Sequence, residues 1–413
     1  MRILKTFFVL TIILFISSCS HDEILEDVKV AVPIYKSKTT IRANVQVTSA
    51  VATNSEGKIY VAEKLLFYIA QENGVHIFDN ANPSNPQNLA YLQIEGVHDI
   101  SVKGNYLYAD NFMDLLVFDI SNLQQISLVQ TLTDVFEFYP TYPMDADYMA
   151  WDVQPNEGDV LIGFKIENRK RPNGQLAILA GNAMANFESQ IGGDVGTGGS
   201  MARFQINNQA LYVVEKYRLS VFNIVQPTQV FYHSSIYLHD WIGTGELETL
   251  FLRSPYLFIG ATTGMFVINA ENPFQPFYVS GFSHATACDP VVVENQTAYI
   301  TVRGGSTCGA IQDQINVIDV SQINQPTLLS TYLLSQPYGL GVKNQTLYVC
   351  ANQQLHVFNA QNPQQLQLLH SYPVNVTDVI PLPNQLIAIG NNLVIQYTYG
   401  PNHTLIPLST LTL

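Results

Sequence analysis

Short segments in which apolar and polar residues alternate follow one another from about Val45 to the end of the chain. Val, Ile, Tyr, Phe and Leu take the apolar positions, and Gly, Asn, Gln, Ser and Pro cluster between the segments. A period of two residues is typical of β-strands with one buried face, and the intervening residue types are those of tight turns. No segment shows a convincing 3.6-residue period. The pattern therefore predicts an all-β chain.

One of these segments, an apolar strand that ends in Asp or Asn, recurs at intervals of 40 to 50 residues. It reads Leu-Leu-Val-Phe-Asp at residues 115–119, and a matching segment ends at Asp79, 40 residues earlier. Further copies end at Asn223, Asn269, Asp319 and Asn359. Repeats of this length that are carried by strands are typical of propellers or solenoids.

Each repeat accommodates four strands joined by short turns. In the repeat that contains Asp119, the predicted strands are residues 98–103, 106–110, 115–120 and 126–132. An Asx residue at the end of the third strand is often followed four positions later by Pro, as in Asp79 and Pro83. An Asx side chain accepts backbone N–H groups in a turn, and Pro cannot continue a strand ladder. We interpret this element as a turn and not as a catalytic motif.

The strand sets predict a β-propeller of four-stranded antiparallel blades, with eight blades and with seven as the alternative. The sets begin near Lys58, His98, Ala150, Met201, Glu248, Asp289, Tyr338 and Thr377. A closed ring is favoured over an open solenoid, because closure removes free sheet edges and a solenoid needs capping repeats. The third set matches least, since its strand at residues 176–179 lacks the Asx residue.

The first residues predict export and lipid anchoring. Arg2 and Lys5 precede an apolar run that is too short for a membrane span of ~20 residues. The following Ile-Ser-Ser-Cys resembles a bacterial lipoprotein signal, in which Cys19 is acylated and becomes the new N-terminus. We expect a signal peptide over residues 1–18, a lipidated cysteine and tether over 19–45, and the propeller over 46–413.

Residues that follow Cys19 indicate the outer membrane of a Gram-negative cell envelope. Ser20 resembles an outer-membrane sorting signal, and the acidic pair at residues 22–23 resembles a surface-export signal. No second apolar run of spanning length occurs, so the acyl chains would be the anchor. An ordinary secretory signal with an incidental cysteine is the alternative.

The composition argues against some classes of binding partner. The chain has 413 residues, of which 13% are charged, and a net charge of −14. An acidic chain without a Lys/Arg cluster argues against nucleic acid and against electrostatic binding to anionic lipid. The nine His residues include no pair at metal-ligand spacing with acidic or Cys companions, and no phosphate loop or Gly-x-Ser-x-Gly motif occurs. We predict no cofactor, no metal site and no catalytic residues.

The strand repeat and several local motifs resemble the LVIVD-repeat family, and most closely a lipoprotein subgroup of it. The local motifs lie at residues 57–60, 196–204, 288–292, 303–309 and 339–341. The resemblance covers roughly residues 58–413 and implies a bacterial cell-surface β-propeller, with no catalytic residues to carry over. Tyr338 stands before Gly-Leu-Gly where the subgroup leads us to expect His.

Strand order predicts which end of the propeller binds ligands. If the innermost strand of each blade runs from face one to face two, the second-to-third and fourth-to-first connections lie on face one. All long irregular segments fall in these connections, namely residues 136–147, 168–173, 182–200, 239–245 and 304–314. Because binding usually resides in the loops of a rigid scaffold, face one is the predicted binding face.

The innermost strands begin on face one with mostly polar residues. The candidate ligand-binding residues, most of them at these strand starts, are His98, Asp99, Asp152, Arg203, Glu248, Asp289, Arg303, Tyr338 and Asp378. They would form a polar, partly acidic channel mouth for a small ligand or a cation. A hydrated channel without a ligand is the alternative, since eight strand ends cannot all be packed with apolar groups.

Cys288 and Cys308 flank the first hairpin of the sixth set and are predicted to form a disulfide. An antiparallel hairpin brings the two positions to the same end, and the bridge would contribute roughly 3 kcal/mol. Asp289 and Arg303 lie beside it, so this place is either a binding site or a stapled loop. Cys350 lies in an apolar strand and is predicted to be a buried free thiol.

Two functions follow from this sequence. The first is a lipid-anchored surface propeller that binds a glycan, a peptide or an envelope protein without catalysis. The second is an envelope hydrolase or lyase that uses acidic residues at the channel mouth. Exposed aromatic side chains on face one favour the first, and two carboxyl groups about 5–10 Å apart in a deep pocket favour the second.

Overall fold

The computed structural model describes residues 25–52, 57–172, 199–238, 245–283, 290–303 and 312–413. The chain divides into two compact units. Unit 1 comprises Met1–Lys36 and Pro140–Asn186, and unit 2 comprises Ser37–Tyr139 and Phe187–Leu413.

The described part of unit 2 contains seven antiparallel sheets, which we number 1 to 7 in chain order. In each sheet the strands follow one another in sequence, and the first strands of successive sheets are neighbours at the inside. Sheet 1 has an additional outer strand, β2 (Gln46–Ser49), which pairs with β6 (Gln87–Gln93). The other strands of sheet 1 are β3 (Gly57–Ala62), β4 (Leu65–Ala70), β5 (Gly74–Asp79) and β6 (Gln87–Gln93). Sheet 2 is formed by β7 (Ile100–Lys103), β8 (Tyr106–Asn111), β9 (Asp114–Asp119) and β10 (Ser127–Leu132). Sheet 3 is formed by β13 (Phe204–Asn207), β14 (Ala210–Val214), β15 (Arg218–Asn223) and β16 (Phe231–Tyr237).

The remaining four sheets repeat the arrangement to the end of the chain. Sheets 4 and 5 are formed by β17 (Leu247–Arg253), β18 (Tyr256–Ala261), β19 (Gly264–Asn269) and β20 (Phe277–Ser283), and by β21 (Val291–Glu294), β22 (Thr297–Val302), β23 (Gln314–Asp319) and β24 (Thr327–Leu333). Sheets 6 and 7 are formed by β25 (Pro337–Lys343), β26 (Thr346–Ala351), β27 (Gln354–Asn359) and β28 (Gln367–Tyr372), and by β29 (Asp378–Pro381), β30 (Gln385–Gly390), β31 (Leu393–Tyr399) and β32 (Leu405–Thr412), with the short 3-10 helix η1 (Pro401–His403) before β32.

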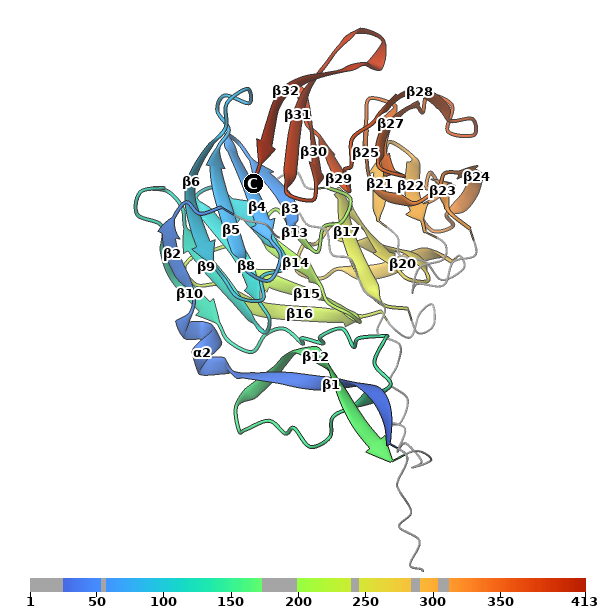
Figure 1. Cartoon of the computed structure of the whole chain (residues 1–413). Helices are drawn as coiled ribbons and strands as arrows, with labels where there is room; N and C mark the ends of the chain where they lie inside the picture. The colour runs from blue at the N-terminus through green and yellow to red at the C-terminus, as the bar shows by residue number, and fades with distance from the viewer. Residues whose placement is uncertain (1–24, 53–56, 173–198, 239–244, 284–289, 304–311) are drawn as a thin grey trace, which may run out of the picture. The chain divides into compact units, whose positions relative to one another are not determined.

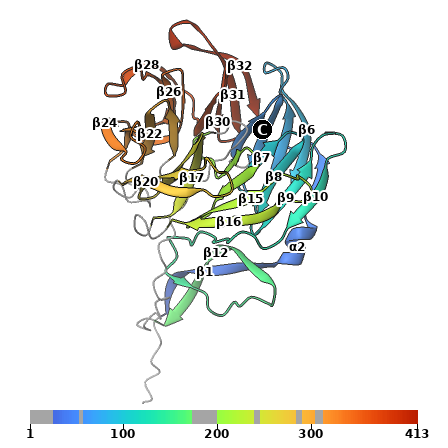
Figure 2. The same cartoon turned by 180° about the vertical axis from the view of Figure 1, so that it is seen from behind.

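Buried apolar side chains pack between each sheet and the next, and also between sheet 7 and sheet 1. At the last of these interfaces Tyr68 and Phe78 of sheet 1 pack with Ile387 and Val394 of sheet 7. Figures 1 and 2 both show the red sheet 7 beside the blue sheet 1. The sheets of unit 2 therefore close into a ring, as expected where both faces of each sheet need cover.

The predicted strands and turns agree with the structure to within one or two residues in sheet 2, where β7 to β10 occupy the predicted ranges. Asn208, Asn295 and Asn344, in the turns between first and second strands, have φ values of 55°, 54° and 49°. Asn tolerates this left-handed conformation better than most residues. Tight hairpins therefore form at the places that the Asn residues indicate.

The Asx residue that ends the third strand in sheets 1 to 6 caps the turn that follows. Its Oδ1 accepts the backbone N–H two residues later, at 2.7–2.9 Å, in Asp79, Asp119, Asn223, Asn269, Asp319 and Asn359. The Pro carbonyls of these turns also accept hydrogen bonds from the preceding sheet, as from Tyr212 to Pro273 at 2.8 Å and from Ser330 to Pro363 at 3.0 Å. The element is thus a turn that also joins neighbouring sheets.

A reciprocal amide pair joins sheet 7 to sheet 1. Asn80 Nδ2 donates to Gln396 Oε1 at 3.0 Å, and Gln396 Nε2 donates to Asn80 Oδ1 at 2.7 Å. Gln396 Nε2 also donates to the carbonyl of Pro83 at 3.1 Å. Both amides are buried, with 6% exposure for Asn80 and 0% for Gln396. Since no described strand crosses from one end of the chain into the other end's sheet, side-chain contacts close the ring.

Replacing Gln396 by Leu is expected to lower the free energy of unfolding by about 1–3 kcal/mol, because the buried Asn80 amide loses its partner. Urea unfolding measures the change. The control is Gln87→Leu, since the Gln87 Nε2 donates only to local carbonyls of an exposed turn. Equal effects of the two substitutions would show that the amide pair does not hold the ring closed.

Unit 1 contains a three-stranded sheet in the order β11 (Tyr148–Met149), β1 (Leu25–Ser37) and β12 (Asp159–Pro172). β1 is parallel to β11, with Val30 opposite Tyr148. Val28, Val30, Val32 and Ala150 form its small apolar core. The described residues of the strand set that the sequence predicts near Ala150 therefore belong to this sheet, and the predicted strand at residues 176–179 lies outside the described residues.

Part of the segment predicted as the tether has regular secondary structure. Residues 25–37 form β1, because Val28, Val30 and Val32 alternate with other residues at the period of a strand. The short helix α2 (Lys38–Ala43) follows, with Ser37 as its N-cap accepting the N–H of Thr40 at 3.1 Å. No helix within the described residues is long and apolar enough to cross a membrane.

Candidate functional site

Four polar residues meet where the innermost strands of unit 2 begin, on face one. Lys58 lies on β3, His98 and Asp99 precede β7, and Asp378 begins β29. The Lys58 Nζ donates to the carbonyl of His98. Burial raises the pKa values of both Asp99 and Asp378, and the Lys58 charge opposes this rise. All four residues are between 0% and 8% exposed, so the structure brings these predicted neighbours together in a buried cluster.

Asp99 joins sheet 2 to sheet 3 through backbone hydrogen bonds. Its Oδ1 accepts the N–H of Ile100 at 2.8 Å, and its Oδ2 accepts those of Arg203 at 2.7 Å and Phe204 at 3.2 Å. Burial raises the pKa of Asp99 to about 6, with Lys58 and the backbone donors opposing the rise. Arg203, a predicted binding residue, contributes its backbone to this contact.

His98 is held by Asp110 of β8. The Asp110 carboxylate accepts the N–H groups of His98 at 2.7 Å and Asp99 at 2.8 Å, and its Oδ2 lies 3.1 Å from His98 Nδ1. Burial acts to raise the pKa of Asp110, but the His98 side chain and the two N–H donors together hold this pKa below its usual value. His98 therefore has a structural partner within its own sheet.

Asp378 joins sheet 7 to Ser200, which lies just before sheet 3. Its Oδ1 accepts the Ser200 hydroxyl at 3.0 Å, the Ser200 N–H at 3.3 Å and the Val379 N–H at 2.9 Å. The Ser200 hydroxyl in turn accepts the N–H of Leu340 in sheet 6, at 2.9 Å. Ser200 therefore links the region before sheet 3 to sheets 6 and 7 at the centre of the ring.

Two glycines make room for the Asp378 carboxyl group. A Cβ atom at Gly199 would overlap its Oδ2, and one at Gly339 would overlap its Oδ1. Burial raises the pKa of Asp378 to about 7, and hydrogen bonds from Val379 and Ser200 oppose the rise. The glycine motifs at residues 196–204 and 339–341 thus each place a glycine against one buried carboxyl group.

The carboxylates at the channel mouth therefore accept hydrogen bonds from other groups of the protein. Asp99, Asp110 and Asp378 accept backbone or side-chain donors from neighbouring segments, and Lys58 supplies a positive charge that acts on both Asp99 and Asp378. Within the described ranges no three His, Cys, Asp or Glu residues are grouped to hold a metal ion. This arrangement stabilises sheet contacts and offers no open carboxylate pair among these three residues.

The other predicted residues fall in different places. Glu248 is 9% exposed on β17, and the Arg303 guanidinium lies 4.7 Å from the ring centre of Tyr338 on β25. Asp152 belongs to unit 1, where Arg169 Nη1 contacts its two carboxylate oxygens at 2.9 and 3.0 Å. Cys19, Cys288, Cys308 and Asp289 lie outside the described residues. Cys350 is a buried free thiol, as predicted.

Residues 134–139, whose role the sequence patterns did not predict, cross face one of sheets 2 and 3. The N–H groups of Val135 and Phe136 donate to the carbonyl of Met113 in sheet 2, at 2.9 and 3.0 Å. The Phe136 ring is buried, 5.5 Å from the ring of Phe222 in sheet 3. The 134–139 segment is therefore fixed to both sheets.

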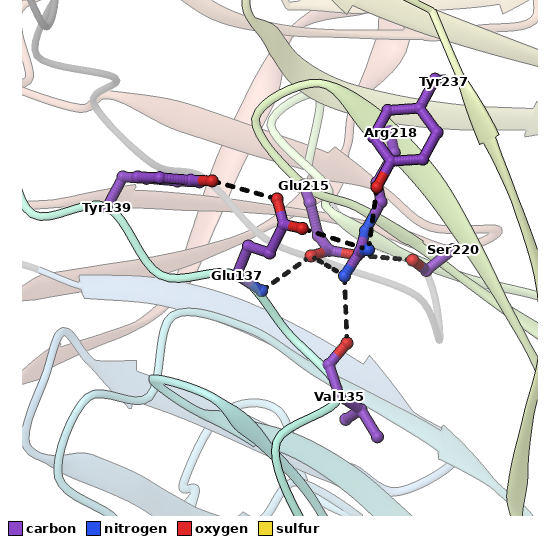
Figure 3. Close-up of polar contacts among 7 residues, drawn as sticks. All are labelled: Val135, Glu137, Tyr139, Glu215, Arg218, Ser220 and Tyr237. Carbon is purple, nitrogen blue, oxygen red and sulfur yellow. Dashed lines mark hydrogen bonds and ion pairs between the residues drawn. The ribbon is translucent and has the colours of Figure 1, made fainter. Parts of the chain in front are cut away.

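A charged network fixes the same segment to the turn between β14 and β15 (Figure 3). Arg218 and Glu215 form a two-fold contact, with Nε to Oε1 at 2.7 Å and Nη2 to Oε2 at 2.8 Å. The Arg218 Nη2 also donates to the carbonyl of Val135 at 3.2 Å, and the Glu137 N–H donates to Glu215 Oε2 at 3.0 Å. The side chains of Glu215 and Arg218 are 7% and 13% exposed, so this pair is largely buried.

Two tyrosines contact the network, and we call Tyr139 and Tyr237 the tyrosine cluster. Tyr139 donates its hydroxyl to Glu137 Oε2 at 3.1 Å, and the Tyr237 hydroxyl accepts from Arg218 Nη1 at 3.3 Å. Figure 3 shows Tyr139 and Tyr237 on either side of the Glu137 carboxylate and the Arg218 guanidinium. Tyr139 is 52% and Tyr237 53% exposed. The hydroxyl groups of these two residues are held while much of each ring faces solvent.

The sequence does contain a signal for this cluster. Residues 215–218 read Glu-Lys-Tyr-Arg, whereas the equivalent turn in sheet 6 is Asn-Gln at residues 352–353. The charged and aromatic residues at positions 215–218 indicate a role beyond the turn itself. Their partners at residues 135–139 are about 80 residues earlier, so the pairing itself required the fold.

Comparisons with known proteins agree with this architecture. The family model described as LVIVD repeat matches residues 58–90 and 96–134, which form sheets 1 and 2 with the start of the 134–139 segment. No curated protein matches the chain.

Solved structures that resemble this chain are β-propellers. A protein from Lactobacillus plantarum is 10% identical with a TM-score of 0.53, over 89% of this chain and 98% of that one. The periplasmic gluconolactonase PpgL from Pseudomonas aeruginosa is 10% identical with a TM-score of 0.52, over 89% of this chain and 96% of that one. At this identity the similarity shows the fold alone. The fold is a propeller of four-stranded antiparallel sheets, and residues 58–134 of this chain match the LVIVD repeat.

Proposed function

We propose that this chain is a seven-bladed propeller of the bacterial cell envelope that binds a ligand on face one without catalysis. Each of the seven sheets of unit 2 would be one blade, and the insertion that contains β11 and β12 would separate the second blade from the third. Seven interfaces between successive sheets support this number.

The tyrosine cluster is the observation that carries the binding role. Half-exposed rings with fixed hydroxyl groups bind ligands at low entropic cost, because little side-chain freedom is lost on binding. The carboxyl groups at the channel mouth also favour binding without catalysis. Asp99 and Asp378 are buried and hydrogen-bonded, whereas a hydrolase needs carboxyl groups that reach its substrate.

A ligand array tests the binding role. Purified protein is applied to immobilised neutral oligosaccharides, acidic oligosaccharides and peptides, and the ligands are then analysed for cleavage by mass spectrometry. We expect binding without cleavage, lost in Tyr139→Ala/Tyr237→Ala and retained in Asp378→Asn. Cleavage that depends on Asp99 or Asp378 would instead support the envelope hydrolase or lyase.

The membrane attachment is a second part of the proposal. The Ile-Ser-Ser-Cys motif at residues 16–19 supports acylation of Cys19 at the outer membrane. Growth with an alkyne-labelled fatty acid is expected to label the protein, and Cys19→Ser is expected to remove the label and release the protein from membranes. Equal labelling of both forms would contradict the anchor.

A further inference from the structure

We infer that the ligand of the tyrosine cluster is a neutral saccharide, which rests on the binding role proposed above. Tyr139 and Tyr237 each present a ring that is about half exposed, 52% and 53%, beside polar groups. A sugar ring has a C–H face that packs on an aromatic ring and hydroxyl groups at its edge. Aromatic side chains with one apolar and one polar end suit such a surface.

The tyrosines are held in place before any ligand arrives. Glu137 accepts the Tyr139 hydroxyl, Arg218 contacts Glu137 Oε1 at 3.4 Å, and the same Arg218 nitrogen donates to the Tyr237 hydroxyl. The Arg218 Cζ also lies 5.9 Å from the centre of the Tyr237 ring. One continuous set of polar contacts therefore fixes both rings, which reduces the entropy lost on binding.

The charges of the site disfavour an anionic ligand. Arg218 is bound through two of its nitrogens by Glu215, and the Lys216 Nζ lies 2.7 Å from Glu246 Oε1. An acidic ligand would have to displace one of these carboxylates. Glu137, with a 45% exposed side chain, is the carboxylate of the network most open to solvent. It supplies acceptor oxygens that suit the hydroxyl groups of a sugar.

Exposed aromatic residues elsewhere on unit 2 differ from the tyrosine cluster. Tyr232 and Phe277 are 40% and 56% exposed at the start of the outermost strands β16 and β20. Leu328, Leu368 and Ile406 are also exposed at the start of β24, β28 and β32. This exposure is a property of the repeat, whereas the tyrosine cluster combines Tyr237 at the end of β16 with Tyr139 of the 134–139 segment.

The test titrates the purified protein with defined probes by isothermal calorimetry. The neutral probes are cellohexaose, maltohexaose and mannohexaose; the acidic probe is a hexamer of galacturonic acid; the peptide probe is a proline-rich decapeptide. We expect binding of at least one neutral hexasaccharide, with an affinity that changes little between about 50 and about 500 mM NaCl because no charge is screened.

Substitutions in the tyrosine cluster distinguish the contribution of the stacked ring from that of the hydroxyl group. Tyr139→Ala and Tyr237→Ala are each expected to weaken binding about tenfold through loss of a stacked ring. Tyr139→Phe keeps the ring and is expected to weaken binding less, and Tyr232→Ala, on the outermost strand of the same sheet, is the control that leaves affinity unchanged.

The possible outcomes show whether the saccharide inference or the assignment of binding to the tyrosine cluster is wrong. Binding of the acidic or the peptide probe alone, lost in the tyrosine variants, would overturn the saccharide and keep the binding role. Saccharide binding that survives Tyr139→Ala/Tyr237→Ala would overturn the assignment to this cluster. No binding to any neutral hexasaccharide would also overturn the inference.

Discussion

Replacing Arg42 by Met is expected to lower the free energy of unfolding of unit 2 by about 3 kcal/mol. Arg42 of α2 binds the Asp114 carboxylate of sheet 2 twice, Nε to Oδ2 and Nη2 to Oδ1, both at 2.8 Å. The Asp114 side chain is 0% exposed, and the variant leaves its charge without the guanidinium. Loss of one partner of a buried pair costs about 3–5 kcal/mol, and the 30% exposure of Arg42 favours the lower end.

The same helix provides the matched control. Lys38 pairs with Asp134, and the two side chains are 36% and 48% exposed. Exposed pairs contribute about 0–1 kcal/mol, so Lys38→Met is expected to change stability by less than about 1 kcal/mol. Urea unfolding of both variants measures the difference. Similar losses would mean that burial of Asp114 does not determine the strength of the Arg42 contact.

Replacing Asp378 by Asn is expected to change how stability depends on pH. The carboxyl group has a pKa of about 7 in the folded protein against 3.8 ordinarily, because it is buried. Between these values the folded state keeps a proton that the unfolded state has released. The group therefore favours folding at low pH, and this contribution is lost as the pH rises through about 7.

A pKa of about 7 in place of 3.8 corresponds to about 4 kcal/mol. The amide in the Asp378→Asn variant keeps an oxygen for the Ser200 and Val379 donors but cannot ionise. The variant is thus expected to be more stable than the wild type by about 2–4 kcal/mol near pH 8.5 and nearly equal to it near pH 4. Urea unfolding at several pH values gives the difference, and a constant difference across that range would contradict a raised pKa.

Comparison with the variant is needed because other groups titrate in the same range. Burial raises the pKa of Asp99 to about 6, which acts in the same direction as Asp378. Burial lowers the pKa of His76 to about 4, so the folded state resists protonation and stability falls as the pH drops from 6.5 to 4. The difference between wild type and Asp378→Asn removes both contributions.

The strands and turns were predictable because they depend on local chemistry. Alternating apolar residues defined β7 to β10, and the Asx residues Asp79 and Asn359 cap the turns that their spacing indicated. The positions of Lys58, His98, Asp99 and Asp378 at one end followed from alignment of hairpins alone. The burial of these residues could not be predicted in this way, because it depends on Gly199 and Ser200, which pack against Asp378 from a distant segment.

The number of strand sets was harder to predict, because the chain between the second and third sheets is long enough to hold a further repeat. Asp119 and Asn223 are 104 residues apart, which is about two repeat periods and suggests one blade between them. The described part of this interval instead contains the 134–139 segment, β11 and β12 before sheet 3 begins. Residues 25–37 were predicted as tether although Val28, Val30 and Val32 alternate there, and the partner strand β11 is more than a hundred residues away. Long-range pairing of this kind leaves no local signal.

We propose that the polar residues at the channel mouth hold the propeller together, while the tyrosine cluster binds the ligand. Calorimetric binding and urea unfolding of Asp378→Asn and of Tyr139→Ala/Tyr237→Ala, measured side by side at about pH 8, separate the two roles. We expect that Asp378→Asn changes stability and keeps affinity, whereas the tyrosine variant loses affinity and changes stability little. A folded Asp378→Asn protein that no longer binds, beside a tyrosine variant that binds normally, would contradict it.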